Sequence, residues 1–310
     1  MRGERGFALV ITLIVTALLV ALLVEFVNEV YVDTSHSHNF VASQQAGILA
    51  QSGIDGGIKL LQFSNSLKQG TPYSSLHDTW AKVPPYDAGV GSVTLSIEEE
   101  SGKLNLNIAT FPNGNANPYT DIAKSLLKQL KEEPELTDVL MDWVDENDLP
   151  QPNGAETSYY STLKSPYAAK NQRLETVEEL LLLKGFTPLM LAKLRSFVTV
   201  YGANNDAETA TLININTAPR ELLASLDPTV KDVLIDQILD YRRKKPIKGP
   251  TDLHEIAGIS AISPLFESRI TYSGSVYRIR SEGRVGESVS VAEAVVRMGP
   301  QPTVLYWREY

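Results

Sequence analysis

The sequence predicts an α+β fold in which a long N-terminal helix lies beside an antiparallel sheet, with a large α-helical domain inserted between the strands. An apolar run opens the chain and leads into a proline-free segment that continues to about residue 68. Strand-like alternation occurs at residues 92–108 and again at 276–298, and the stretch between them is helical in pattern. One sheet built from both ends of the chain explains this order. Two domains in series would leave each pair of strands as a marginal sheet.

The apolar run, residues 7–24, contains no charge, proline or glycine, and its only polar side chains are Thr12 and Thr16. At 1.5 Å per residue it spans about 27 Å, close to the hydrocarbon thickness of a bilayer. A secretory signal peptide would end in a small-residue cleavage site, but Glu25 and Phe26 follow the run, and Gly6 precedes it. The run therefore predicts a membrane helix, and the position of Gly6 favours a short leader cleaved before the helix, with an ordinary uncleaved anchor as the alternative.

Charges on either side of this run predict its orientation. Arg2 and Arg5 precede it, whereas Glu25, Glu29 and Asp33 follow it. Because basic residues are retained in the cytoplasm, we expect Met1 on the cytoplasmic side and the large domain outside.

Beyond the membrane run, apolar residues keep helical spacing to about residue 68. Ile54, Ile58 and Leu61 stand at i, i+4 and i+7. Four glycines count against a helix, since each costs about 1 kcal/mol relative to alanine; they are Gly47, Gly53, Gly56 and Gly57. The sequence favours one continuous helix, with a break at Gly56-Gly57 as the alternative.

The strands are predicted from alternation. Residues 70–91 form a loop, residues 92–98 alternate polar and apolar side chains, and residues 103–108 alternate again after the Ser101-Gly102 turn. This order predicts a hairpin. A second pair of strands is expected at residues 276–280 and 288–298, with a turn at 282–286.

The helical block between the strands contains seven expected helices. Amphipathic spacing, N-caps and the Thr176–Glu179 capping box indicate helices at residues 120–131, 137–144, 174–184, 188–201, 218–225, 230–244 and 251–257.

Composition excludes several classes of function. The chain has 310 residues, a net charge of −9 and no cysteine, so a general nucleic-acid surface and thiol chemistry are not expected. No Ser-His-Asp arrangement, metal-binding histidine pair or phosphate loop indicates an enzyme.

The densest polar cluster follows the helix expected at residues 137–144. Asp138, Asp142 and Asp145 share one helix face, and Asn147, Asp148 and Glu156 lie in the loop after it. A hard cation such as calcium would relieve the repulsion between these carboxylates. The residues alone favour a solvated acidic loop over a calcium site.

A second cluster, residues 215–226 and 238–260, has the pattern of tandem helix-hairpin-helix units, which bind DNA in other settings. Arg242, Arg243, Lys244, Lys245 and Lys248 add a basic patch. The hairpin at residues 226–230 lacks the glycines that let backbone amides approach phosphate. A membrane-anchored DNA-binding protein is therefore the alternative, and a helix terminus or partner surface is favoured.

Taken together, these motifs resemble the minor pseudopilin K family of the type II secretion system. The matching stretches are the leader RGFALVITLIVTALLVALL, SGKLNLNIA, DWVDENDLPQPNGAE with Tyr159-Tyr160, ETVEELLLLKGFTP and LININTAPRELL. The resemblance implies a non-enzymatic, pilin-like protein. Its expected parts are a prepilin leader at residues 1–6, a long helix at 7–68, a sheet at 69–110 and 275–300, and an inserted helical domain at 111–274.

The resemblance also implies processing and a metal site. A prepilin peptidase would cut between Gly6 and Phe7, and the new Phe7 amine would be methylated. Structural calcium is expected in the helical domain, with ligands drawn from Asp142, Asp145, Asn147, Asp148 and Glu156. Family members often have aspartate where this chain has Asn147, so a lower affinity is expected.

Ile11 narrows the expected role. Major pseudopilins resemble each other in having glutamate as the fifth residue after the cleaved glycine, and here that residue is Ile11. A subunit without this carboxylate has no partner for the amine of a subunit above it, but its own amine can pair with a subunit below. We therefore expect a tip subunit that is anchored in the inner membrane and extracted into the periplasmic pseudopilus. Its expected partners are the minor pseudopilins I and J and the major pseudopilin below, and no nucleic acid is expected.

Overall fold

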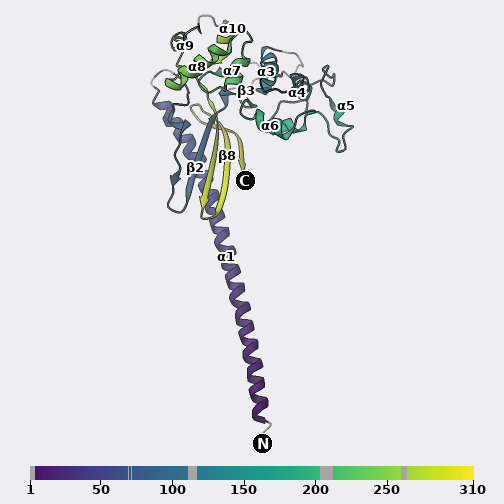
Figure 1. Ribbon diagram of the computed structural model, residues 1–310, viewed down its shortest axis with the longest axis vertical. Coiled ribbons are helices and arrows are strands. Elements are labelled where there is room, and N and C mark those ends of the chain that lie inside the picture. Colours follow the sequence, from purple (N-terminus) through teal and green to yellow (C-terminus); the bar gives the residue numbers. More distant parts are fainter. Residues whose placement is uncertain (1–3, 69, 71, 111–116, 203–211, 260–263) are drawn as a thin grey trace.

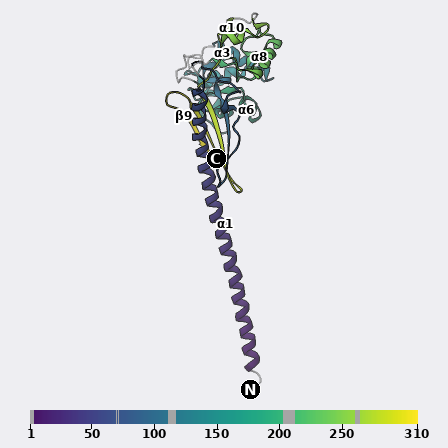
Figure 2. The same ribbon diagram turned by 90° about the vertical axis from the view of Figure 1, so that its left-hand side faces the viewer.

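The long N-terminal helix is continuous. The computed structural model describes the chain apart from residues 1–3, 69, 71, 111–116, 203–211 and 260–263. Helix α1 runs from Glu4 to Ser66, and its first half projects away from the rest of the molecule (Figures 1 and 2). The continuous helix is confirmed, and the alternative break at Gly56-Gly57 is wrong.

The glycines of α1 explain how the helix packs on the sheet. Gly53 and Gly57 are buried on the face that contacts the sheet. A Cβ atom at Gly57 would lie 2.9 Å from Ile279 Cγ2, and one at Gly53 would lie 2.8 Å from Val93 Cγ1. The glycines therefore allow the helix backbone to approach the strands closely, which compensates for their low helix propensity.

The sheet has five strands in the order β1-β2-β7-β8-β9, and every neighbouring pair is antiparallel. The strands are β1 (Tyr86–Asp87), β2 (Ser92–Glu99), β7 (Val276–Val285), β8 (Ser288–Arg297) and β9 (Thr303–Glu309). One face of the sheet packs against α1 around Ile54, Leu61, Ile97, Tyr277 and Ile279. The sheet is thus built from both ends of the chain, as expected.

The predicted hairpin at residues 92–108 is wrong. Strand β2 pairs with β7, from Ser92 opposite Arg284 to Glu99 opposite Tyr277. Residues 104–109 form instead a two-residue strand, β3 (Leu104–Asn105), and a short helix, α2 (Leu106–Ala109). β3 pairs in parallel with β4 (Val198–Thr199), which belongs to the insertion. Alternation therefore identified extended backbone only at Leu104–Asn105, and it did not identify the partner of this strand.

The insertion between β2 and β7 begins earlier than the expected residue 111, because Leu104 and Leu106 already belong to its core. Similarly, the sheet does not end at residue 300, because β9 adds a strand. The described helices of the insertion are short; besides α2 they are α3 (Pro118–Gln129), α4 (Leu136–Val144), α5 (Thr157–Tyr160), η3 (Val177–Leu182), α6 (Pro188–Leu194), α7 (Arg220–Ser225), α8 (Asp232–Lys244), α9 (Pro250–His254) and α10 (Pro264–Glu267).

Two of the expected helices differ in kind or length. The Thr176–Glu179 capping box is present, but it opens the 3-10 helix η3 and not an α-helix. Helix α6 ends at Leu194, well before residue 201, because Val198 and Thr199 form strand β4. A further parallel pair, β5 (Ile213–Asn214) with β6 (Ile270–Thr271), ties the second half of the insertion together.

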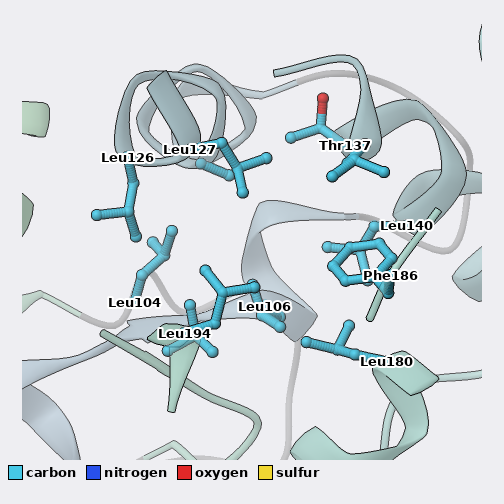
Figure 3. Close-up of a pocket in the computed structure, with 12 residues that line it drawn as sticks. Leu104, Leu106, Leu126, Leu127, Thr137, Leu140, Leu180, Phe186 and Leu194 are labelled. Atoms are coloured by element: carbon cyan, nitrogen blue, oxygen red, sulfur yellow. The ribbon is translucent and has the colours of Figure 1, made fainter. Parts of the chain in front are cut away.

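The core of the insertion is apolar and nearly filled. Leu104, Leu126, Leu140, Leu180 and Leu194 point toward a shared space among α3, α4, η3 and α6 (Figure 3). The cavity there holds only about 20 Å³, far below the several hundred Å³ of a typical ligand pocket. This region is therefore a packing core and not a small-molecule site.

A buried carboxylate joins the insertion to the sheet. Glu99, at the end of β2, accepts hydrogen bonds from Ser74 Oγ at 2.8 Å, Asn214 Nδ2 at 2.7 Å and Thr217 Oγ1 at 2.9 Å. Burial raises the pKa of Glu99, and the three hydrogen bonds oppose this shift. Beside it, the carboxylate of Glu100 contacts both Lys103 and Arg278. The insertion is thus fixed to the end of the sheet farther from the N-terminus (Figure 1).

Candidate metal centre

The predicted acidic cluster lies at the carboxyl end of α4 and in the loop that follows. Every residue of α4 is buried, so the helix carries Asp142 into the interior of the insertion. Asp145 caps the end of α4 in an extended conformation, and Glu156 directly precedes α5. The chain therefore returns after the loop to place a third acidic residue beside the first two.

Three carboxylates converge at this point. The side chains of Asp142, Asp145 and Glu156 are buried, and each contributes an oxygen within 4.8 Å of the others. In the described part of the chain, Asp145 Oδ2 and both carboxylate oxygens of Glu156 have no hydrogen-bond partner. Buried polar atoms normally find partners, so these orphan oxygens fit a ligand set for a cation.

The electrostatics of the three carboxylates also favour a bound cation. Burial, followed by the charges of Asp142 and Asp145, raises the pKa of Glu156 to about 7. Burial and neighbouring carboxylates also raise the pKa values of Asp142 and Asp145. A divalent cation would remove the repulsion and replace the lost hydration of these groups. The oxygen-only donors in an irregular loop suit calcium, which accepts six to eight oxygens in flexible geometry.

The other two predicted ligands lie beside this cluster and not within it. Asn147 Nδ2 donates to Asp145 Oδ1 at 2.8 Å, and Asn147 Oδ1 accepts a hydrogen bond from the backbone of Leu149 at 2.8 Å. Asn147 therefore orients Asp145 and shapes the loop. Asp148 is exposed at the rim, where its charge contributes to the raised pKa of Glu156.

Asp138 shares the helix face of Asp142 but takes a different role. Its Oδ1 lies 3.8 Å from Lys124 Nζ, and its Oδ2 accepts a hydrogen bond from Asn153 Nδ2 at 3.0 Å. Asp138 thus ties the loop back to α4 and α3.

Two residues of the site were not predicted. A Cβ atom at Gly154 would lie 2.6 Å from Asp142 Cγ, so only glycine leaves room for this carboxylate. Asn171 has a positive φ of 49° and donates through Nδ2 to Asp148 Oδ1 at 3.4 Å, while its own buried Oδ1 has no partner among the described residues. The glycine was visible in the loop motif. No sequence signal connects Asn171 with residues 23 positions earlier.

An aromatic cluster supports the loop from the core side. Trp143 contacts Tyr160 edge-on with ring centroids 5.3 Å apart, and Tyr160 stacks on Tyr167 at 5.2 Å. Tyr160 is fully buried, which raises its pKa to about 12. Trp143 is therefore an intrinsic fluorescent reporter adjacent to Asp142.

The predicted processing and assembly residues lie in the first turns of α1. Gly6 and Phe7 are helical, and Ile11 is 44% exposed. Within the described residues, α1 is the one helix long and apolar enough to cross a membrane. Its apolar window has no buried residue, as expected for a segment that meets lipid.

Known proteins match the chain over most of its length. Two family models, both described as type II secretion system protein K, match residues 102–203 and 213–271. The type II secretion system protein K of Aeromonas hydrophila is 27% identical over 91% of this chain and 92% of its own length. That of Klebsiella pneumoniae is 32% identical over 44% of each chain.

The fold also has a solved counterpart. A chain in the crystal structure of the GspK-GspI-GspJ complex of enterotoxigenic Escherichia coli superposes with a TM-score of 0.69. The superposition covers 91% of this chain and 99% of that chain, at 18% identity. The arrangement of long helix, sheet and helical insertion is therefore shared.

Proposed function

Because the chain belongs to the protein K family of the type II secretion system, we propose that this minor pseudopilin occupies the tip of the pseudopilus. There it assembles with the minor pseudopilins I and J to initiate or cap the fibre, above the major pseudopilin. One observation carries this proposal: the bulky insertion lies at the end of the molecule opposite the N-terminus (Figure 1). Such a domain is difficult to stack within a narrow fibre but fits at its end. The role is structural and requires no catalysis.

The membrane segment supports an inner-membrane origin. We infer that the N-terminus is cytoplasmic and the folded domain periplasmic, because Arg2 and Arg5 precede the apolar run and acidic residues follow it. Prepilin peptidase would cleave after Gly6. Ile11 then supports the tip position, since it offers no carboxylate that could pair with the N-terminal amine of a subunit above.

Calcium is part of the proposal. Asp142, Asp145 and Glu156 would hold the ion, with Asp148 and Asn171 beside them. A bound ion would neutralise the buried carboxylates and thereby fix the long loop after α4 to α5. Its contribution is to stability and loop geometry.

The DNA-binding alternative is not supported by the basic residues. Arg242 Nη1 donates to the carbonyl oxygens of Ile215 and Ala218. Arg243 pairs with Asp240 at 2.8 Å, and Lys245 pairs with Glu255 at 2.7 Å. Because these three cations already have partners within the chain, they do not favour a phosphate-binding surface.

The tip assignment is tested by co-purification. The full chain is produced with tagged minor pseudopilins I and J and extracted in detergent. We expect a stable complex that contains all three proteins. A chain that is folded by circular dichroism but binds neither partner would refute the tip complex.

The calcium assignment is tested by thermal melting with calcium, magnesium or a chelator. Binding to the native state alone stabilises a protein by about 2.7 kcal/mol when the ligand is at a hundred times its Kd. We expect calcium to raise the Tm of the wild type and to change Trp143 fluorescence. Asp145→Asn should abolish the calcium-dependent shift, whereas Glu146→Gln, which alters the exposed neighbouring acid, should preserve it. Equal shifts in the two variants would exclude this site.

A further inference from the structure

The loop between α4 and α5 contains an asparagine followed by a glycine, Asn153-Gly154. Asparagine is a chemically labile residue, because the backbone nitrogen of the next residue can attack its side-chain amide. Glycine in the next position favours this attack, since it has no Cβ atom to hinder the approach. Asn153 is exposed, so water reaches it. The dipeptide therefore combines a reactive sequence with access to solvent.

The structure of the loop uses both residues of this dipeptide. A Cβ atom at Gly154 would lie 2.6 Å from Asp142 Cγ, so glycine leaves room for this carboxylate. Asn153 Nδ2 donates a hydrogen bond to Asp138 Oδ2 at 3.0 Å. Asp138 in turn lies 3.8 Å from Lys124 on α3. The two residues that shape the loop thus form a labile pair.

In the folded loop both reacting groups are engaged. The nucleophile would be the backbone nitrogen of Gly154, whose N–H donates to the carbonyl oxygen of Gln151 at 3.0 Å and closes a turn over residues 151–154. The leaving group would be Nδ2 of Asn153, which donates to Asp138. The reaction therefore requires the turn to open.

Two further contacts hold the turn closed. Gln151 N donates to Asp142 Oδ1 at 3.0 Å and to Oδ2 at 3.2 Å, so the turn is attached to one of the three converging carboxylates. Lys184 Nζ donates to the carbonyl oxygen of Gly154 at 3.2 Å and lies over the ring of Tyr159. A cation held by Asp142 would stabilise the first contact, because it would remove the repulsion from neighbouring carboxylates.

We propose that Asn153 is a site of deamidation and isomerisation, and that cation binding to the loop suppresses this reaction. The nitrogen of Gly154 loses its proton to solvent base and forms a bond to Cγ of Asn153. The bond from Cγ to Nδ2 then breaks, and the amide nitrogen takes up a proton and leaves as ammonia. Water opens the resulting cyclic imide to aspartate or to isoaspartate, in which the backbone runs through the side chain. No oxidant or reductant is needed.

The product would fit the loop poorly. Both aspartate and isoaspartate add a negative charge beside Asp138 and remove the N–H group that donates to it. Isoaspartate also lengthens the backbone next to Gly154, which already lies against Asp142. Loss of the cation would thus be followed by a covalent change in the loop that holds it. The link to the cation rests on the calcium site proposed above.

The chain supplies an internal control for the test. Pro-Asn-Gly occurs at residues 152–154 and again at 112–114, outside the described residues, and these are its two Asn-Gly sequences. The full chain in detergent is incubated at mildly alkaline pH with calcium or with a chelator. Mass spectrometry of the two peptides follows the small mass increase that accompanies replacement of an amide by a carboxylate.

Calcium should slow the reaction at Asn153 specifically. If the ion binds only the closed turn, calcium at a hundred times its Kd lowers the population of the open turn by about a hundredfold. We therefore expect the reaction at Asn153 to be at least about tenfold slower with calcium than with chelator, and the rate at Asn113 to change much less. Equal rates at Asn153 in the two conditions, the same change at both asparagines, or no reaction at Asn153 while Asn113 reacts would overturn the proposal.

The Tm of the same samples separates this proposal from the calcium assignment. A Tm that rises with calcium while the rate at Asn153 stays constant would refute the control of the modification and leave the calcium site standing. A Tm that does not respond to calcium would refute the calcium site itself.

A pair of variants tests the turn without altering the predicted ligands. Lys184→Met removes the hydrogen bond to the carbonyl oxygen of Gly154, and Lys164→Met changes another exposed lysine of the insertion as a matched control. Loss of one hydrogen bond changes an opening equilibrium by about two- to tenfold. We expect Asn153 to react faster by this factor in Lys184→Met than in Lys164→Met, with calcium present in both. Equal rates in the two variants would exclude control of the reaction by the turn.

Discussion

The close approach of α1 to the sheet predicts different effects on stability for two alanine substitutions three residues apart. Gly56 is exposed, and a Cβ atom there would have no neighbour within 4 Å. Gly53→Ala, in contrast, would place its Cβ 2.8 Å from Val93 Cγ1 and even closer to Ser281 Oγ. Separations below about 3 Å require the helix or the strand to move.

The expected changes in stability follow from two contributions, helix propensity and overpacking. Both substitutions gain about 1 kcal/mol from helix propensity. Gly53→Ala also incurs an overpacking cost of about 1–3 kcal/mol, so the difference between the two variants measures this cost directly. At about 2–4 °C per kcal/mol, Gly56→Ala should raise the Tm by about 2–4 °C, and Gly53→Ala should melt about 2–12 °C below Gly56→Ala.

The assay is thermal unfolding of the full chain in detergent, followed by circular dichroism with calcium held constant. The comparison is between the two variants, so effects of detergent and metal cancel. If Gly53→Ala gains as much stability as Gly56→Ala, the glycine does not serve close packing.

Three further predictions concern the insertion and its junction with the sheet. Because burial raises the pKa of Glu99 above its unfolded value, its contribution to stability is greatest below that unfolded value and is lost as pH rises toward the folded pKa. Urea unfolding of Glu99→Gln should therefore show a weaker loss of stability above pH ~4.5 than the wild type; parallel pH profiles would contradict this. Gly154→Ala should abolish the calcium-dependent change in fluorescence although Asp142 is still present. An unchanged calcium titration would show that the loop moves to accommodate the added methyl group. Leu126→Ala should enlarge the core cavity and cost about 2–5 kcal/mol in the free energy of unfolding, whereas a loss below about 1 kcal/mol would indicate collapse of the cavity.

Much of the fold could be predicted from local patterns. The uninterrupted apolar run and helical spacing predicted α1, and alternation located β2, β7 and β8. Helix propensity alone counted the glycines of α1 as evidence against a continuous helix. In the structure their missing side chains are what allows α1 to contact the strands, and only the tertiary contact reveals this.

Pairing was less predictable than extended structure. Leu104 and Asn105 follow a turn and alternate like a hairpin partner, yet they pair with β4 inside the insertion. Asn105 Oδ1 then accepts a hydrogen bond from Asn107 N and starts α2. The final strand, β9, was missed although its β-branched and aromatic residues are typical of strands.

The acidic site was predicted in part. Helical spacing placed Asp142 near Asp145, the loop pattern added Glu156 to the same cluster, and the family resemblance favoured calcium as its ligand. Spacing could not separate Asp138, which pairs with Lys124, from the converging carboxylates. The roles of Gly154 and Asn171 depend on contacts that the folded loop creates, so no local pattern contains them.

The insertion of one domain between adjacent strands has a consequence for the order of folding. Glu100 and Arg278 form an ion pair although they are 178 positions apart in the chain. Closing a loop of that length around an unfolded chain is entropically costly and slow. Once the insertion has folded, its two ends are already side by side, and β2 meets β7 as in a short hairpin. We therefore expect the inserted domain to fold before the sheet closes on α1.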